Sequence, residues 1–402
     1  MSVAASHPNL RRLPDRWHRA PRRWGHPLHA VCSYFAMFPP QLAHVFVKWL
    51  TRPGDTVYDP FCGRGTVGLE AALTGRRALL SDANPLAEAL AAAKVQIPSS
   101  VRVHRRLREL RQAYVAGAED LDEVPPMIRM LYTDGTLRQL MHLRRALGRG
   151  PADTLLRAMV LGMLHANHSR NGATRGFSIS MPNTFAMAPI YVEHYIAKHG
   201  LVAPECDVFA MLGARVDRMQ LPSKTHDAGR AWRQDATQPL ALGEERPRLV
   251  LTSPPYLEVI QYGKYNWVRL WFLGEDAKQV DATLSTTSSL TRYLQFMTDV
   301  LGRLGDALDA DAFVALVIGD VRRGNEQLNL AGAVADRVAI PGGWHCHGTI
   351  VDRLPTKHKV SRIWKNQPGR ATKIDRVLLL SRRPQPLPPL SPIRWKSSSF
   401  SP

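Results

Sequence analysis

The chain has 402 residues, of which 45% are hydrophobic and 22% are charged. This composition is typical of a folded, globular chain and excludes a disordered one. Lys and Arg total 53 against 34 Asp and Glu, so the formal net charge is +19. Such an excess of positive charge favours a polyanionic partner, and nucleic acid is the leading candidate.

Neither a membrane span nor a metal site is expected from the sequence. The most apolar run, residues 313–318, is far shorter than the roughly 20 residues that cross a bilayer, and no apolar signal core begins the sequence. The four cysteines lack the paired spacing of a disulfide framework or a zinc site. His345-Cys346-His347 alternates faces along a strand and cannot converge on one ion. We therefore predict a cytoplasmic protein without a bound metal.

The first elements along the chain predict an arm followed by a βαβ unit. Residues 1–25 carry six arginines and too few aliphatic side chains for a core, so we expect a basic arm. Apolar residues from Leu42 to Leu50 have helical spacing. The following segments alternate in type: a strand at 56–58, a turn at 63–65, a helix at 67–73 and a strand at 78–82. The carboxyl ends of these strands form the expected ligand edge.

Residues 100–230 have long helical patterns, at 137–147 and 154–164 for example, without obvious buried strands, and we interpret them as an inserted domain. Its arginine runs at 102–111 and 138–149 either contact phosphates or form solvated helix faces. Strand patterns then resume at 248–252, 313–318, 349–351 and 376–380. The resulting division is an arm at 1–25, a sheet domain at 26–99 and 231–383, a largely helical insert at 100–230, and a flexible tail at 384–402.

The first chemical motif, Asp59-Pro60-Phe61-Cys62-Gly63-Arg64-Gly65-Thr66, lies where the first strand ends and a helix begins. Its glycines permit close backbone approach of a ligand, but it lacks the third glycine of a dinucleotide fingerprint and the lysine of a phosphate loop. Asp82 ends the next strand, where an acidic side chain can accept hydrogen bonds from both hydroxyls of a ribose. The motif therefore favours a nucleoside without phosphates.

The second chemical motif, Thr252-Ser253-Pro254-Pro255-Tyr256, follows the apolar strand Leu249 to Leu251. The prolines stiffen the backbone and donate no hydrogen bond, so the Ser253 hydroxyl and the Pro254 carbonyl are two fixed acceptors. Such a pair suits a planar amino group, and Tyr256 can stack on the ring that carries it. The plain alternative is a strand-to-loop transition with a buried tyrosine.

Together, the two motifs resemble those of the amino-methylating DNA methyltransferases, specifically the cytosine-N4 type with its S-P-P-Y signature. The resemblance spans residues 30–96 and 232–383, and it implies the class I methyltransferase fold, a Rossmann-like, doubly wound, seven-stranded mixed α/β sheet. It also implies S-adenosylmethionine as cofactor, double-stranded DNA as partner and extrusion of the target base. The implied cofactor-binding residues are Phe38, Asp59, Pro60, Phe61, Gly63, Gly65, Thr66, Asp82 and Asp235. The implied catalytic residues are Ser253, Pro254, Pro255 and Tyr256.

Candidate DNA contacts lie in two polar segments. The basic cluster between the last two predicted strands includes Lys357, Lys359, Arg362 and Arg370, and a polar loop of the insert includes Asn167 and Arg170. A role in restriction-modification would add a separate cognate endonuclease. The alternatives that remain open are methylation of the adenine N6 amine, to which the related D-P-P-Y loop belongs, methylation of RNA, and a catalytically inactive DNA-binding regulator.

Overall fold

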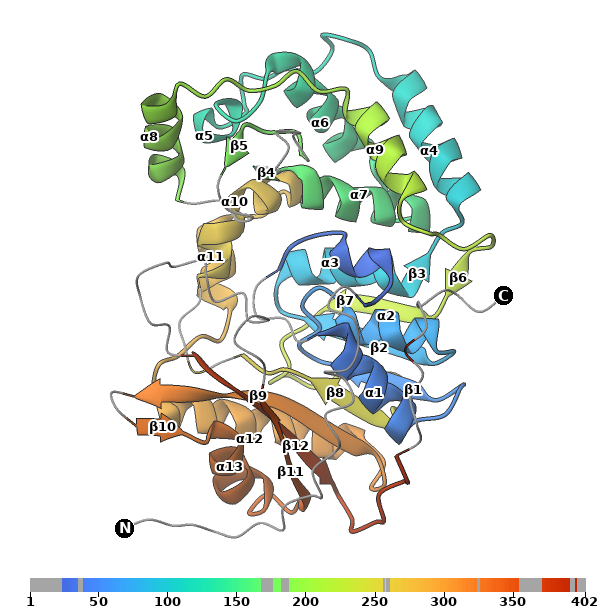
Figure 1. Ribbon diagram of the computed structural model, residues 1–402, viewed down its shortest axis with the longest axis vertical. Coiled ribbons are helices and arrows are strands. Elements are labelled where there is room, and N and C mark those ends of the chain that lie inside the picture. Colours follow the sequence, from blue (N-terminus) through green and yellow to red (C-terminus); the bar gives the residue numbers. More distant parts are fainter. Residues whose placement is uncertain are drawn as a thin grey trace.

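The computed structural model describes residues 24–34, 39–167, 176–181, 188–255, 257, 261–323, 326–353, 371–390 and 395. Within these ranges, seven strands form one continuous sheet in the order β11-β12-β9-β8-β1-β2-β7 (Figure 1). Their bounds are β1 Thr56–Asp59, β2 Arg77–Asp82, β7 Gly229–Arg233, β8 Leu249–Thr252, β9 Phe313–Arg323, β11 His345–Arg353 and β12 Ala371–Ser381. The short strand β10 (Glu326–Leu328) pairs with β9 as a hairpin.

The directions of the strands place the ligand edge. The strands β7, β2, β1, β8 and β9 are all parallel, whereas β12 runs antiparallel to both of its neighbours. Strand order reverses between β1 and β8, because the chain first builds outward through β2 and β7 and then returns to the other side of β1. Ligands of such sheets bind at the carboxyl ends of the two strands at this switch point. The predicted doubly wound mixed sheet is confirmed.

Helices cover both faces of the sheet, in accordance with the period of two along each strand. On one face, Phe313, Ala315 and Val317 of β9 pack in a cluster with α1 (Pro40–Leu50) and α2 (Thr66–Leu73). On the other, Val314, Leu316 and Ile318 pack against α12 (Leu290–Ala307), α13 (Leu330–Val334) and the π-helical turn Ala335–Ala339. The buried alternation therefore fixes which face each strand residue serves.

Between β2 and β7 the chain forms a helical region that lies beside the sheet (Figure 1). The chain leaves through α3 (Pro85–Val95) and β3 (Gln96–Ile97) and returns through β6 (His226–Asp227), which pairs with β3. The helices of this region are α4 Ser100–Ala113, α5 Pro126–Arg129, α6 Asp134–Ala146, α7 Pro151–Met163, α8 Pro189–His199 and α9 Val208–Asp217, with the two-residue strands β4 (Ala166–Asn167) and β5 (Ser180–Met181). Two further helices, α10 (Tyr262–Leu273) and α11 (Ala277–Thr283), follow β8.

The helical region shares its core with the sheet domain. One apolar cluster joins Leu86 and Leu90 of α3 to Leu137 of α6, Leu155 of α7 and Trp267 of α10. Its helices therefore pack directly on the elements that flank the ligand edge. The edge strand β7 begins at Gly229, two residues before the predicted return to the sheet at 231. A Cβ at Gly229 would lie 1.8 Å from the carbonyl oxygen of Ala78 in β2, so the strand starts at a close backbone approach.

Part of the segment predicted as a flexible tail packs against the sheet domain. The Trp49 indole of α1 donates to the Pro388 carbonyl at 2.7 Å. The Trp395 ring lies 5.1 Å from the Trp24 ring and 6.0 Å from the His44 ring, centroid to centroid. Leu387 and Leu390 are half-buried against the same cluster. These apolar side chains hold residues 384–390 and Trp395 on α1. The segment is predicted to be flexible because it is rich in proline and serine, and that composition does not show that its few apolar side chains pack.

Candidate active site

Two glycines with positive φ form the turn between β1 and α2. Gly63 has φ +48° and Gly65 has φ +73°, backbone angles that residues other than glycine rarely adopt. A Cβ at Gly65 would lie 2.8 Å from the Ala91 Cα of α3, and a Cβ at Gly63 would lie 3.3 Å from the Tyr34 ring. The turn therefore lies against α3 on one side and against Tyr34 on the other.

Asp82 ends β2 and lies beside this turn. Its Oδ2 accepts from the Gly63 N–H at 2.9 Å, and its Oδ1 accepts from the Asn84 N–H, also at 2.9 Å. Each of these carboxylate oxygens has a second lone pair, so the side chain can accept two further hydrogen bonds. Burial raises the pKa of Asp82 to about 6, and its two backbone hydrogen bonds partly offset that rise.

The carboxyl end of β8 is tied to both neighbouring strands. The Thr252 hydroxyl donates to Asp59 Oδ1 of β1 at 2.6 Å, and the Ser253 hydroxyl donates to the Val317 carbonyl of β9 at 3.1 Å. Asp59 is 2% exposed, and burial raises its pKa to about 7 despite the bond from Thr252. Because the bond to Val317 uses the Ser253 proton, the Ser253 oxygen can act only as an acceptor toward any other partner.

One pocket brings the two sequence motifs together at the switch point. Gly63 and Asp82 line it from the first half of the sheet, and Ser253, Pro254 and Pro255 line it from the second. It has an empty volume of about 750 Å³, part of it open to solvent. The other lining residues are Tyr34, Phe61, Ala83, Asn84, Gln234, Asp235, Ala236, Tyr262, Leu284, Ser285, Thr286 and Phe296.

The remaining predicted cofactor residues lie behind this lining or outside the described residues. Asp59, Pro60, Gly65 and Thr66 belong to the strand, turn and helix that support the pocket and are not among its lining residues. Asp235 lines the pocket, and its Oδ1 accepts from both the backbone N–H and the hydroxyl of Thr237 at 2.9 Å. The predicted residues Phe38 and Tyr256 fall outside the described residues.

Of the predicted DNA-contacting residues, all but Asn167 lie outside the described residues. They are Lys357, Lys359, Arg362, Arg370 and Arg170, and only the backbone of Asn167, in β4, is described. Their assignment stays a prediction.

Several pocket residues have no motif in the sequence. Tyr34 precedes the first regular helix, and Leu284 to Thr286 connect α11 to α12, so neither segment has a pattern that predicts a site. Asn84 caps α3, its Oδ1 accepting from the Leu86 N–H at 3.0 Å. An Asn-Pro pair after Asp82 predicts this helix start, although it does not predict that Asn84 lines a pocket.

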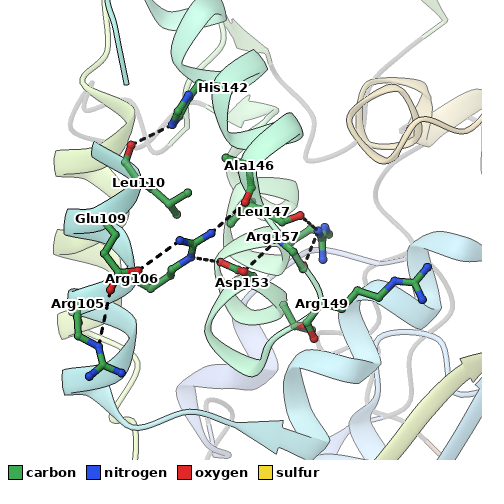
Figure 2. Close-up of polar contacts among 12 residues, drawn as sticks. Arg105, Arg106, Glu109, Leu110, His142, Ala146, Leu147, Arg149, Asp153 and Arg157 are labelled. Atoms are coloured by element: carbon green, nitrogen blue, oxygen red, sulfur yellow. Dashed lines mark hydrogen bonds and ion pairs between the residues drawn. The ribbon is translucent and has the colours of Figure 1, made fainter. Parts of the chain in front are cut away.

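Much of the basic charge of the helical region is paired within the protein. Arg106 of α4 donates to Asp153 at 2.7 Å, to Glu109 at 3.3 Å and to the Ala146 carbonyl at 3.0 Å (Figure 2). Arg111 pairs with Asp207 at 2.9 Å in the same way. In α6, Arg145 pairs with Glu119 at 2.5 Å. Arg106 and Arg111 therefore connect α4 to other helices, and Arg145 connects α6 to the segment between α4 and α5. The sequence alone could not separate such arginines from a phosphate-binding face.

In the described part of the chain, none of the helices is both long and apolar enough to span a bilayer. In the same ranges, no group of three or more His, Cys, Asp or Glu side chains is arranged to hold a metal ion.

Strand order, the antiparallel strand β12 between β9 and β11, and a pocket at the β1/β8 switch point define the class I methyltransferase fold. Residues 6–93 match the family described as DNA methylase, the amino-methyltransferases that act at N6 or N4. A Type II methyltransferase, M.XycI of Xanthomonas campestris pv. cyanopsidis, is 41% identical over 64 residues, which are 16% of this chain and 21% of that protein. Over this segment the chain resembles that family, and the resemblance supports S-adenosylmethionine as the cofactor.

Among solved structures, the rRNA methyltransferase aviRa from Streptomyces viridochromogenes is similar with a TM-score of 0.35 and 15% identity, over 88% of this chain and 90% of that one. TrmN from Thermus thermophilus has a TM-score of 0.34 and 12% identity, over 88% of this chain and 52% of that one. Because both TM-scores are low, the fold is assigned from the order and directions of the strands and not from these two structures. The chain spans about a fifth of the length of M.XycI in its match.

Proposed function

We propose that this chain is an S-adenosylmethionine-dependent DNA methyltransferase that methylates the exocyclic N4 amine of cytosine. The observation that carries the proposal is a shared pocket, lined by Gly63 and Asp82 on one side and by Ser253, Pro254 and Pro255 on the other. The match of residues 6–93 to DNA methylases supports the same class of reaction. Double-stranded DNA as substrate, extrusion of its base and a part in restriction-modification belong to the proposal as well.

The residues of the first half of the pocket fit a nucleoside cofactor. Asp82 can accept from two ribose hydroxyls while it keeps its backbone hydrogen bonds to the turn. Asp235 lies on the same lining and is our candidate acceptor for the adenine amine. Gly63 leaves no side chain between the turn and the pocket, so a ligand can approach the backbone closely. When bound, S-adenosylmethionine supplies an electrophilic sulfonium methyl group.

The residues of the second half fit an amine that must become a nucleophile. The lone pair of the cytosine N4 amine is delocalised into the ring, so the enzyme must orient that nitrogen and favour its tetrahedral form. Ser253 Oγ and the Pro254 carbonyl are acceptors that can each bind one N–H of the amine. The strand ends tied by Thr252 and Asp59 fix these acceptors relative to the glycine turn. No covalent bond to the enzyme is needed.

Nucleoside analysis tests the proposal. We expect expression in a host whose DNA lacks N4-methylcytosine to yield this nucleoside in the digested DNA, measured by mass spectrometry. Ser253→Ala should lower its formation about 10- to 1000-fold, the effect of losing one preorganised polar contact, while affinity for S-adenosylhomocysteine stays within about twofold. The appearance of N6-methyladenine alone would overturn the cytosine assignment. Absence of both methylated nucleosides, together with no binding of S-adenosylhomocysteine, would overturn the proposed function.

A further inference from the structure

Residues 24–34, here called the strap, connect the helical region to the glycine turn. The strap contains one 3-10 turn, Pro27–Ala30, and its apolar side chains Leu28, Val31 and Cys32 are buried in the cluster that the helical region shares with α3. It contacts the turn at one end and helices of the insert along its length. In both sets, the contacts include hydrogen bonds to backbone carbonyls of the strap.

Three arginines from three different elements hold these carbonyls. Arg64, between the two glycines of the turn, donates to the His29 carbonyl at 2.8 Å. Arg215 of α9 donates to the Val31 carbonyl at 2.5 Å and to the Ala30 carbonyl at 3.4 Å. Arg269 of α10 donates to the Ser33 carbonyl at 3.1 Å. The backbone of the strap is therefore fixed jointly by the turn, the insert and the helix that follows the S-P-P-Y motif.

The insert also contacts the strap through α7. A Cβ at Gly162 would lie 1.9 Å from the Val31 carbonyl oxygen and 3.2 Å from the Cys32 Cα, so the strap backbone rests directly on this helix. Beneath the strap, the His29 ring lies 2.7 Å from the buried Glu70 carboxylate of α2. The strap is thus enclosed between the insert and the helix that the glycine turn begins.

The strap ends at Tyr34, which lines the pocket. The Tyr34 hydroxyl accepts from the Asn84 amide at 3.0 Å, and its ring lies 6.0 Å from the ring of Tyr262. Because the same ring lies over Gly63, any displacement of the strap changes the wall beside the glycine turn.

The burial and the hydrogen bonds of the Arg215 guanidinium favour a role in positioning the strap. Its guanidinium is partly buried, and its Nε has no hydrogen-bond partner in the described part of the chain. Burying a guanidinium without full hydrogen bonding is costly, and the strap carbonyls receive the hydrogen bonds that it does make. A role in packing alone could be served by an apolar side chain at lower cost.

We propose that the insert sets the cofactor affinity of the pocket through the strap, with Arg215 as the positioning residue that keeps Tyr34 over the glycine turn. The inference rests on the proposed function, because it takes the pocket to be the S-adenosylmethionine site. By linkage, a ligand that alters the position of α9 must alter cofactor affinity, and bound cofactor must alter affinity for that ligand by the same factor.

Calorimetric titration with S-adenosylhomocysteine tests the proposal. Arg215→Ala should raise the Kd by about 3- to 30-fold, the effect of mutations along a coupling network, and Arg215→Lys should give a smaller increase because one donor remains. The matched control is Arg157→Ala, since Arg157 is also partly buried and donates to two backbone carbonyls, those of Leu147 and Gly148, within the insert (Figure 2). This control should leave the Kd unchanged.

A double-mutant cycle separates positioning from stability. If Arg215 acts through Tyr34, the Kd of the Arg215→Ala/Tyr34→Ala protein should equal that of Tyr34→Ala alone, whatever the melting temperatures are. Additive effects of the two substitutions would overturn this inference, and so would an equal Kd for Arg215→Ala and Arg157→Ala. In either case, binding of S-adenosylhomocysteine to the wild-type chain would still support the cofactor site. Should Arg215→Ala not fold, Arg215→Lys in the same cycle decides by the same criterion. A wild-type chain that binds no S-adenosylhomocysteine would overturn both proposals.

Discussion

The carboxylates at the ends of β1 and β2 differ in what they face, although burial raises both pKa values. Asp82 lines the pocket and keeps acceptor capacity on both oxygens, whereas Asp59 accepts the Thr252 hydroxyl and connects two strands. The first can therefore bind a ligand, and the second fixes the spacing between the two halves of the site.

The raised pKa of Asp82 predicts that cofactor affinity depends on pH. Only the ionised carboxylate can accept from both ribose hydroxyls, and protonation near pH 6 replaces one acceptor with a donor. As pH falls below about 6, the Kd for S-adenosylhomocysteine should therefore rise toward about tenfold per pH unit, and it should be constant above about pH 7. Calorimetry from pH 5 to pH 8 measures this dependence.

Asp82→Asn is the control for that pH dependence. The variant should bind more weakly at pH 8 and give a flatter curve, because the amide does not titrate. Asp59, whose pKa is raised to about 7, is unchanged in the variant, so any pH dependence that it causes remains there. Parallel curves for the two proteins would contradict the assignment of the effect to Asp82.

At individual positions, the sequence predicts residues that follow a strand more reliably than residues that come from connections. Gly63, Asp82 and Ser253 follow apolar strands, and parallel strands bring their ends to one edge. Tyr34 and Thr286 reach the same pocket from irregular segments. Their positions depend on tertiary contacts, such as the hydrogen bond from Arg269 to the Ser33 carbonyl, and these contacts have no local sequence pattern.

Among the elements, β7 is the strand of the sheet that has no apolar pattern in the sequence to predict it. The predicted strands are apolar runs buried on both faces, such as residues 249–251 and 313–318. In contrast, β7 reads Gly-Arg-Ala-Trp-Arg and lies at the edge of the sheet, where its side chains are half-buried or exposed after the first residue. An edge strand needs only one partner and need not be apolar, so its composition resembles that of a loop.

The basic helix α4 gives a prediction about elements. Arg106 bridges α4 to Asp153 of α7 and to the carboxyl end of α6, so Arg106→Ala should lower the free energy of unfolding by about 1–2 kcal/mol. Arg108, exposed on the same helix, is the matched control, and Arg108→Ala should change stability by less than about 0.5 kcal/mol. Urea denaturation measures both. Equal effects of the two substitutions would mean that Arg106 stabilises the protein no more than a solvated surface arginine does.

At the scale of the whole molecule, the insert and the sheet domain share a core, which a linear division of the chain does not predict. Residues 100–230 have a helical pattern of their own, and on that basis they resemble a separate domain. The apolar cluster nevertheless includes α3, which follows β2, and α10, which follows β8. A periodic apolar face shows that a helix is buried, but it does not show which element covers it.

The net charge of +19 also acts at the scale of the whole molecule, and part of it is already paired internally. Free cations should therefore contribute most to DNA affinity, and residues 1–23 carry six arginines before the strap begins. Each lost phosphate contact lowers the slope of log Kd against log salt by about 0.9. Deleting residues 1–23 should then lower the slope by up to about 5, measured with a 30-bp duplex between about 50 and 300 mM NaCl.

The deletion leaves the strap intact, so affinity for S-adenosylhomocysteine should stay within about twofold of that of the full chain. This second measurement distinguishes loss of phosphate contacts from disturbance of the pocket. A slope unchanged by the deletion would mean that residues 1–23 make no phosphate contacts and that the salt-dependent part of the affinity lies elsewhere. Weaker cofactor binding with an unchanged slope would instead mean that these residues support the strap, because electrostatic contact with DNA has no effect when DNA is absent.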